Sequence, residues 1–178
     1  MDMIFSIDTA VNVSISEYVT AVFASCAHWI STIADAEVLI VLGVVLVGYF
    51  IWRRQRRDAT IMALSIISSA VVIFSLKELV ARTRPFNALE IIIGDPSFPS
   101  GHAGMSAAFF GALLAILLPK MQSRISRILL TVLAVSLIFI IGMSRLVLSV
   151  HWASDVVVGW VIGIVAVVVS VWVGRRVK

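Results

Sequence analysis

Long apolar runs, separated by short polar breaks, make up most of the chain. A helix needs about 17 to 25 apolar residues to cross the roughly 30 Å hydrocarbon core of a bilayer. Runs of this kind cover approximately residues 36–52, 59–80, 103–118, 128–148 and 152–173. The pattern predicts an all-α, polytopic membrane helix bundle with about five transmembrane helices.

Residues 10–34 show a different pattern, in which apolar and polar side chains fall on separate stripes of a helix. The apolar stripe carries Ile15, Val19, Val22, Cys26, Trp29, Ile30 and Ile33, and the polar one Ser14, Glu17, Ser25, His28, Ser31 and Asp35. We expect an N-terminal amphipathic helix that lies in the membrane interface or packs against the bundle. A sixth, more polar span is the alternative.

Gly159 and Gly163 lie four residues apart in the last apolar run. Small residues at this spacing let two membrane helices approach closely. We expect them to pack inside the bundle, and a dimer seam is the alternative.

Composition supports a membrane protein. Of the 178 residues, 61% are hydrophobic and only 13% are charged, whereas soluble domains carry about a quarter charged residues. An ordinary cytosolic enzyme and a nucleic-acid-binding protein are therefore excluded, and we expect one integral membrane domain over residues 1–178. The lone cysteine, Cys26, can form neither an internal disulfide nor a thiolate metal site.

Basic residues in the short loops predict the orientation, because lysine and arginine are retained on the cytoplasmic side. If all five runs cross, one side carries Arg53, Arg54, Arg56, Arg57, Lys120, Arg124, Arg127, Arg175, Arg176 and Lys178. The other side carries Lys77, Arg82, Arg84 and Arg145. The first residues have no basic region or small-residue cleavage site, so we expect no removable signal peptide.

Two cations lie at the outer end of the second run. Lys77 and Arg84 are seven residues apart, two helical turns, so both can face one anion if the helix reaches Arg84. The alternative is that these long side chains snorkel to the interface. Arg82 fits that alternative, and the sequence assigns it no role.

The third run begins with Ser100, Gly101 and His102, after a turn-rich stretch at 94–99. Ser100 is suited to cap the helix, and the free backbone N–H groups of a helix N-terminus bind phosphate. Gly101 would let an anion approach the backbone closely, although a purely structural cap explains both residues equally well.

His151 and Asp155 are four residues apart at the start of the fifth run, after Ser144 and Arg145 at the end of the fourth. The carboxylate can accept a hydrogen bond from one ring nitrogen and leave the other free as a nucleophile. A structural histidine–aspartate pair is the alternative. Arg145 adds a guanidinium suited to phosphate oxygens.

Together these residues resemble the type 2 phosphatidic acid phosphatases, which share an active-site plan with vanadium-dependent haloperoxidases. The family pattern is Lys, six residues, Arg-Pro; then Pro-Ser-Gly-His; then Ser-Arg, five residues, His, three residues, Asp. The chain matches it at every specified position with Lys77, Arg84, Pro85, Pro99, Ser100, Gly101, His102, Ser144, Arg145, His151 and Asp155. The resemblance covers roughly residues 36–173.

The resemblance implies phosphoryl transfer through a phosphohistidine, without a metal or another cofactor. His151 would be the nucleophile, Asp155 would orient it, and His102 would be the general acid and base. The phosphate would be held by Lys77, Arg84, Ser100, Gly101 and Arg145.

The resemblance implies a phosphorylated lipid of a bacterial plasma membrane as the substrate. The loop cations on the opposite side predict that the site lies at the extracytoplasmic face. Undecaprenyl pyrophosphate, phosphatidic acid and phosphatidylglycerol phosphate are the candidates. An anion channel or transporter would use the same cations but would not need the histidine–aspartate spacing. A vanadate-dependent oxidase shares the site, but those relatives are soluble and larger; a purely structural module requires all three motifs to be accidental.

Overall fold

The structure, a computed structural model, describes residues 2–85, 88–89 and 94–177. Its helices are α1 (Asp2–Tyr18), α2 (Ala21–Ile33), α3 (Ala36–Trp52), α4 (Arg56–Val80), α5 (Gly101–Leu117), α6 (Arg124–Val147) and α7 (Ala153–Gly174), with a 3₁₀ turn (Leu118–Lys120) after α5. The described residues contain no β-strand. The all-α prediction is confirmed.

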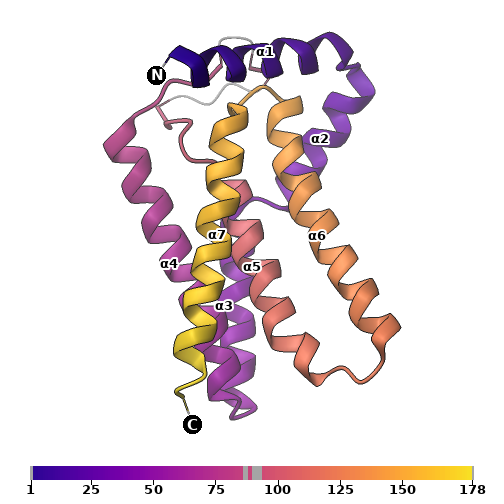
Figure 1. Ribbon diagram of the computed structural model, residues 1–178, viewed down its shortest axis with the longest axis vertical. Helices are drawn as coiled ribbons and strands as arrows, with labels where there is room; N and C mark the ends of the chain where they lie inside the picture. The colour runs from indigo at the N-terminus through magenta and orange to yellow at the C-terminus, as the bar shows by residue number, and fades with distance from the viewer. Residues whose placement is uncertain (1, 86–87, 90–93, 178) are drawn as a thin grey trace.

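Five segments are long and apolar enough to cross a membrane: Ala21–Trp52, Arg56–Val80, Gly101–Lys120, Arg124–Val147 and Ala153–Gly174. They cover the five predicted runs except for Leu148 and Trp152, each one residue beyond a segment. The first includes both α2 and α3, which are joined at Ala34–Asp35. Figure 1 shows α3 to α7 as a bundle of long, roughly aligned helices.

The prediction of one amphipathic helix over 10–34 is wrong in its boundaries, because two helices cover this region. α1 already begins at Asp2, and the helix is interrupted at Val19–Thr20. The Thr20 hydroxyl caps α2 by accepting a hydrogen bond from the Phe23 N–H. Such a cap competes with a continuous helix. α1 lies across one end of the bundle (Figure 1), and α2 packs against α6.

α1 buries two polar residues against the bundle. Asp8 and Asn12 are buried, whereas Ile4, Phe5 and Ile7 are more than half exposed. An apolar outer surface suits a helix at the membrane boundary. In the bundle too, Ser65, Ser69 and Ser106 are fully buried while many large apolar side chains are exposed on the outside.

Helix α5 occupies the centre and packs against α3, α4, α6 and α7. Its contact with α7 is close because both helices carry small residues. A Cβ added at Gly159 would lie 2.6 Å from the Ser100 carbonyl oxygen, and one at Gly163 would lie 2.6 Å from the Ala107 Cβ. The glycine pair therefore packs inside the bundle, as expected from the sequence.

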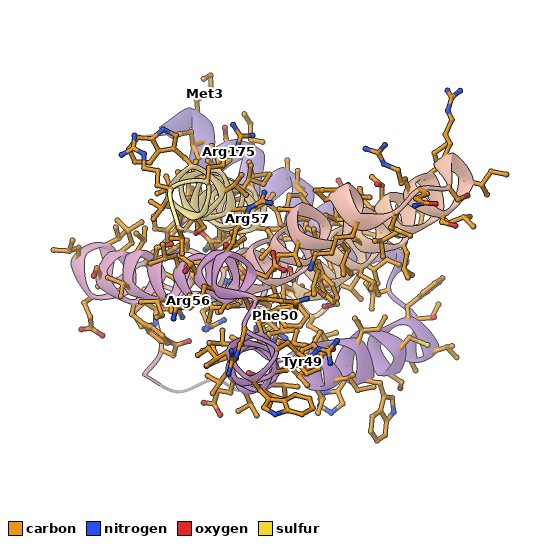
Figure 2. The ribbon with its side chains drawn as sticks, turned by 90° about the horizontal axis from the view of Figure 1, so that it is seen from below. Met3, Tyr49, Phe50, Arg56, Arg57 and Arg175 are labelled. Atoms are coloured by element: carbon orange, nitrogen blue, oxygen red, sulfur yellow. The ribbon has the colours of Figure 1, made fainter. Side chains whose placement is uncertain are left out.

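One end of the bundle collects the predicted cytoplasmic cations. The α3–α4 turn, the α5–α6 connection and the C-terminus lie together at this end (Figure 1), and the view from below in Figure 2 shows Arg56, Arg57 and Arg175 there. Lys178 falls outside the described residues. At the same end Lys120 pairs with Asp58 at 2.5 Å.

We expect Gly163→Ala to destabilise the protein by about 1–3 kcal/mol, because the new methyl group would overlap α5. Gly48→Ala is the matched control, since a Cβ there would meet no atom within 4 Å. Thermal unfolding in detergent, followed by tryptophan fluorescence, measures both. Equal midpoints for the two variants would contradict the close α5–α7 packing.

Candidate active site

The three motifs converge at the end of the bundle opposite the clustered cations. They surround a cavity of about 590 Å³. Of the predicted site residues, those that line it are Lys77, Arg84, Gly101, His102, Arg145 and His151. Ser100 and Asp155 lie behind this lining and are fully buried.

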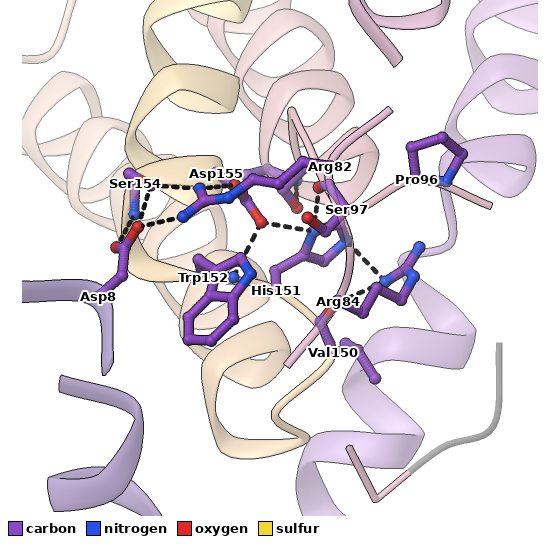
Figure 3. Close-up of polar contacts among 12 residues, drawn as sticks. Asp8, Arg82, Arg84, Pro96, Ser97, Val150, His151, Trp152, Ser154 and Asp155 are labelled. Carbon is purple, nitrogen blue, oxygen red and sulfur yellow. Dashed lines mark hydrogen bonds and ion pairs between the residues drawn. The ribbon is translucent and has the colours of Figure 1, made fainter. Parts of the chain in front are cut away.

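His151 lies in the turn between α6 and α7. Its Nδ1 is 2.6 Å from the Ser97 carbonyl oxygen, and its Nε2 is 3.5 Å from the Arg84 guanidinium (Figure 3). A carbonyl can only accept a hydrogen bond, so Nδ1 carries the proton of the neutral ring. The lone pair is then on Nε2, which makes Nε2 the nucleophilic atom.

The surroundings of His151 favour its neutral form. Burial lowers the pKa of His151 well below its ordinary value, and the charges of Arg84, Arg145 and Lys77 lower it further, against the hydrogen bond to Ser97. A neutral ring keeps the Nε2 lone pair available at ordinary pH.

Asp155 lies close to His151 but is not its nearest acceptor. Its Oδ2 is 3.6 Å from Nδ1 and accepts a hydrogen bond from the Trp152 N–H at 2.9 Å. The Ser97 carbonyl is the nearer partner of the ring and was not predicted from the sequence. An approaching backbone carbonyl leaves no signature in side-chain identities.

The structure does not support the interpretation of Arg82 as a side chain that snorkels to the membrane interface. Its guanidinium donates to Asp155 at 2.6 Å, to Ser154 at 2.8 Å and to Asp8 at 2.7 Å (Figure 3). The fully buried carboxylate of Asp155 needs such a cation, because an unpaired charge in the interior is costly. The need of Asp155 for a cation was the only feature of the sequence that pointed to a role for Arg82.

Lys77 and Arg84 contact the same partner, Asp95. The helix ends at Val80, so the expected two-turn helical spacing does not account for this convergence. The Lys77 amino group is 2.7 and 2.6 Å from the two carboxylate oxygens of Asp95, and Arg84 is 2.7 Å from one of them. Burial alone would raise the pKa of Asp95, but the Lys77 and Arg84 contacts outweigh it and lower the pKa. Asp95 was missed because it lies in a turn-rich stretch that resembles an ordinary loop.

Ser100 caps α5, as predicted, by accepting from the Ala103 N–H at 3.5 Å. Its own N–H donates to the Asp155 carbonyl at 3.0 Å and so joins the start of α5 to α7. A Cβ at Gly101 would meet no atom within 4 Å, which leaves the first turn of α5 open toward the cavity.

His102 and Arg145 share a partner on α2. The Ser31 hydroxyl is 3.3 Å from His102 Nε2 and accepts a hydrogen bond from Arg145. Asp35, in the α2–α3 connection, is 3.7 Å from the same His102 nitrogen. The sequence placed Ser31 and Asp35 only on a polar stripe, so their contribution to the site was not predicted.

Within the described residues, no group of three or more His, Cys, Asp or Glu side chains could hold a metal ion. The cavity instead combines a neutral histidine with lysine and arginine side chains and the N-terminus of a helix. These groups can hold an anion with several oxygens and attack it with a nitrogen nucleophile.

Comparison with known sequences identifies a matching family and two relatives. The PAP2 superfamily sequence model matches residues 58–178. The chain is 31% identical over 119 residues to an "Undecaprenyl-diphosphatase" of Sulfolobus acidocaldarius, covering 64% of this chain and 53% of that one. It is 29% identical over 133 residues to "Phosphatidylglycerophosphatase B" of Bacillus subtilis, covering 74% and 64%. The chain thus spans less than two thirds of either relative.

Solved structures share the fold. A transmembrane PAP2-type phosphatidylglycerolphosphate phosphatase from Bacillus subtilis superposes with a TM-score of 0.86 at 23% identity, over 100% of this chain and 89% of that one. LpxE of Aquifex aeolicus superposes with a TM-score of 0.71 at 24% identity, over 92% and 94%.

We expect the His151 ring to remain neutral at pH 6.5, because its lowered pKa moves protonation to more acidic pH. Arg84→Ala removes a neighbouring cation and should raise this pKa. NMR of ¹⁵N-labelled histidine in detergent, assigned with His151→Ala, measures the titration. Arg127→Ala, at the opposite end of the bundle, is the control, and an equal shift in both variants would contradict the local effect.

Asp95→Asn should strengthen the binding of inorganic phosphate about tenfold, because Lys77 and Arg84 lose a charged partner that competes with the anion. Isothermal titration with orthophosphate measures the dissociation constant. Asp58→Asn, which removes a carboxylate from Lys120 at the other end, is the matched control. Unchanged affinity in Asp95→Asn would mean that the phosphate binds elsewhere.

Proposed function

Since the chain belongs to the PAP2 superfamily, we propose that it is a membrane phosphatase that removes phosphate from a lipid through a phosphohistidine intermediate. The observation that carries this proposal is the His151 ring, with Nδ1 donating to the Ser97 carbonyl and Nε2 directed at Arg84. The ring is a neutral nucleophile next to the cations that an anionic substrate needs.

In the first step, His151 Nε2 attacks phosphorus and the bond from phosphorus to the leaving oxygen breaks. Lys77, Arg84 and Arg145 balance the charge on the phosphoryl oxygens, where most of the catalysis of phosphoryl transfer arises. His102 protonates the leaving oxygen. Asp155, 3.6 Å from Nδ1, stabilises the positive charge that develops on the ring.

In the second step, His102 takes a proton from water, and the resulting nucleophile attacks the phosphohistidine. The phosphorus–nitrogen bond breaks, inorganic phosphate leaves, and His151 returns to its neutral form. One histidine thus serves as acid and then as base, as two-step transfer requires.

A lipid substrate is supported by the walls of the cavity. Besides the cations, the lining includes the apolar residues Ile40 of α3 and Ala70, Ile73 and Phe74 of α4. Phe74 is also more than half exposed on the outer surface of the bundle. This arrangement suits a molecule whose phosphate enters the cavity while its chain stays in the bilayer. Undecaprenyl pyrophosphate, phosphatidic acid and phosphatidylglycerol phosphate are the substrates to test.

The clustered cations support an orientation of the site in the membrane. Nine of the ten loop and terminal basic residues belong to the described part of the chain. The segments around them, the α3–α4 turn, the α5–α6 connection and the C-terminus, lie together at one end of the bundle (Figure 1). By the positive-inside rule, the reaction takes place at the extracytoplasmic face of the plasma membrane.

We expect purified protein in detergent to release phosphate from at least one of the three lipids in the presence of EDTA, because lysine and arginine take the place of a metal ion. His151→Ala should lower the rate at least about 1,000-fold, as loss of a nucleophile does in other enzymes. A phosphate-release assay measures both, and thermal unfolding checks that the variant is folded.

Full activity of His151→Ala would refute the assignment of the nucleophile. If the wild type released phosphate from none of the lipids, the proposed function would fail. Phosphate flux into proteoliposomes would then test the alternative, an anion transporter.

A further inference from the structure

Asp8 of α1 is a buried carboxylate outside the motifs. Only 1% of it is exposed. Its Oδ1 accepts a hydrogen bond from the Ser154 N–H at 2.9 Å, and its Oδ2 accepts from the Ser154 hydroxyl at 2.5 Å and from Arg82 at 2.7 Å. A charge held this fully in the interior requires a specific reason, because burial of an ion is costly.

Arg82 is shared between two carboxylates. One terminal nitrogen of its guanidinium contacts Asp8, and the other contacts Asp155 at 2.6 Å (Figure 3). The guanidinium is planar and rigid, so fixing one nitrogen also fixes the direction of the other. Asp8 therefore limits how Arg82 can approach Asp155.

The two carboxylate oxygens of Asp155 then have different partners. Oδ1 accepts from Arg82, whereas Oδ2 accepts from the Trp152 N–H and lies 3.6 Å from His151 Nδ1. If Asp8 lost its charge, the guanidinium could turn and engage both oxygens of Asp155, the bidentate geometry that arginine prefers. This would draw negative charge away from His151.

We propose that Asp8 is a positioning residue for the reaction, acting through Arg82 on Asp155. This inference rests on the proposed function, and it places an active contribution in α1, outside the region 58–178 that matches the family. Asp8, Arg82 and Asp155 are not among the described residues that line the cavity. The effect therefore falls on the chemical step more than on substrate binding.

The test is a double-mutant cycle with Asp8→Asn, Arg82→Gln and the double variant, assayed for phosphate release from the best lipid substrate. Asp8→Asn should lower kcat about tenfold, a size that neighbours within one ion-pair network can reach, and leave KM nearly unchanged. In the Arg82→Gln background the same substitution should have little further effect. Glu17→Gln, which removes an exposed carboxylate from the same helix, is the matched control.

Two outcomes would overturn the proposal. If Asp8→Asn lowered thermal stability but left kcat unchanged, Asp8 would only attach α1 to the bundle. If the effects of the two substitutions on kcat were fully additive, Asp8 would not act through Arg82.

The ¹⁵N signal of His151 Nδ1 provides a readout that does not depend on turnover. Asp8→Asn should shift this signal, and Glu17→Gln should not. A wild-type protein without phosphatase activity would refute the proposed function, whereas an unshifted His151 signal in Asp8→Asn would refute the positioning role alone.

Discussion

The close approach of α5 and α7 determines where the reactive groups can lie. His102 lies in the first turn of α5 and Asp155 in the first turn of α7, and the hydrogen bond from the Ser100 N–H to the Asp155 carbonyl joins the two helix ends. Gly159 and Gly163 make this contact possible, because a side chain at either position would overlap α5. A wider separation would move His151 and His102, the proposed nucleophile and acid–base residue, apart without changing either residue.

Charge pairing is the second constraint. Lys77 and Arg84 face Asp95, and Arg82 faces Asp8 and Asp155, so each of these cations has a carboxylate within hydrogen-bonding distance. Pairing offsets the cost of desolvating charges in a low-dielectric bundle. The pairs differ in exposure, since the Asp95 side chain is 48% exposed and that of Asp155 is fully buried. Of these two carboxylates, only Asp95 is exposed enough for an incoming anion to displace it from its cations.

The parts that could be predicted from the sequence depend on signals carried by neighbouring residues. Apolar runs of membrane length predicted α3 to α7, and the three motifs predicted which residues meet around the cavity. The interruption between α1 and α2 at Thr20 was missed because the apolar stripe keeps the same helical spacing on both sides of it. Asp8, Asp95 and Ser31 were missed because their partners are 74, 18 and 71 residues away along the chain, at Arg82, Lys77 and His102.

Two helices, α5 and α7, begin at the site and run away from it. The aligned peptide dipoles of an α-helix place about half a positive charge at its N-terminus. This part of the attraction for a phosphate does not come from an ionisable group. It does not change with pH, so this contribution to a positive potential remains under conditions in which the side chains of the cavity change charge.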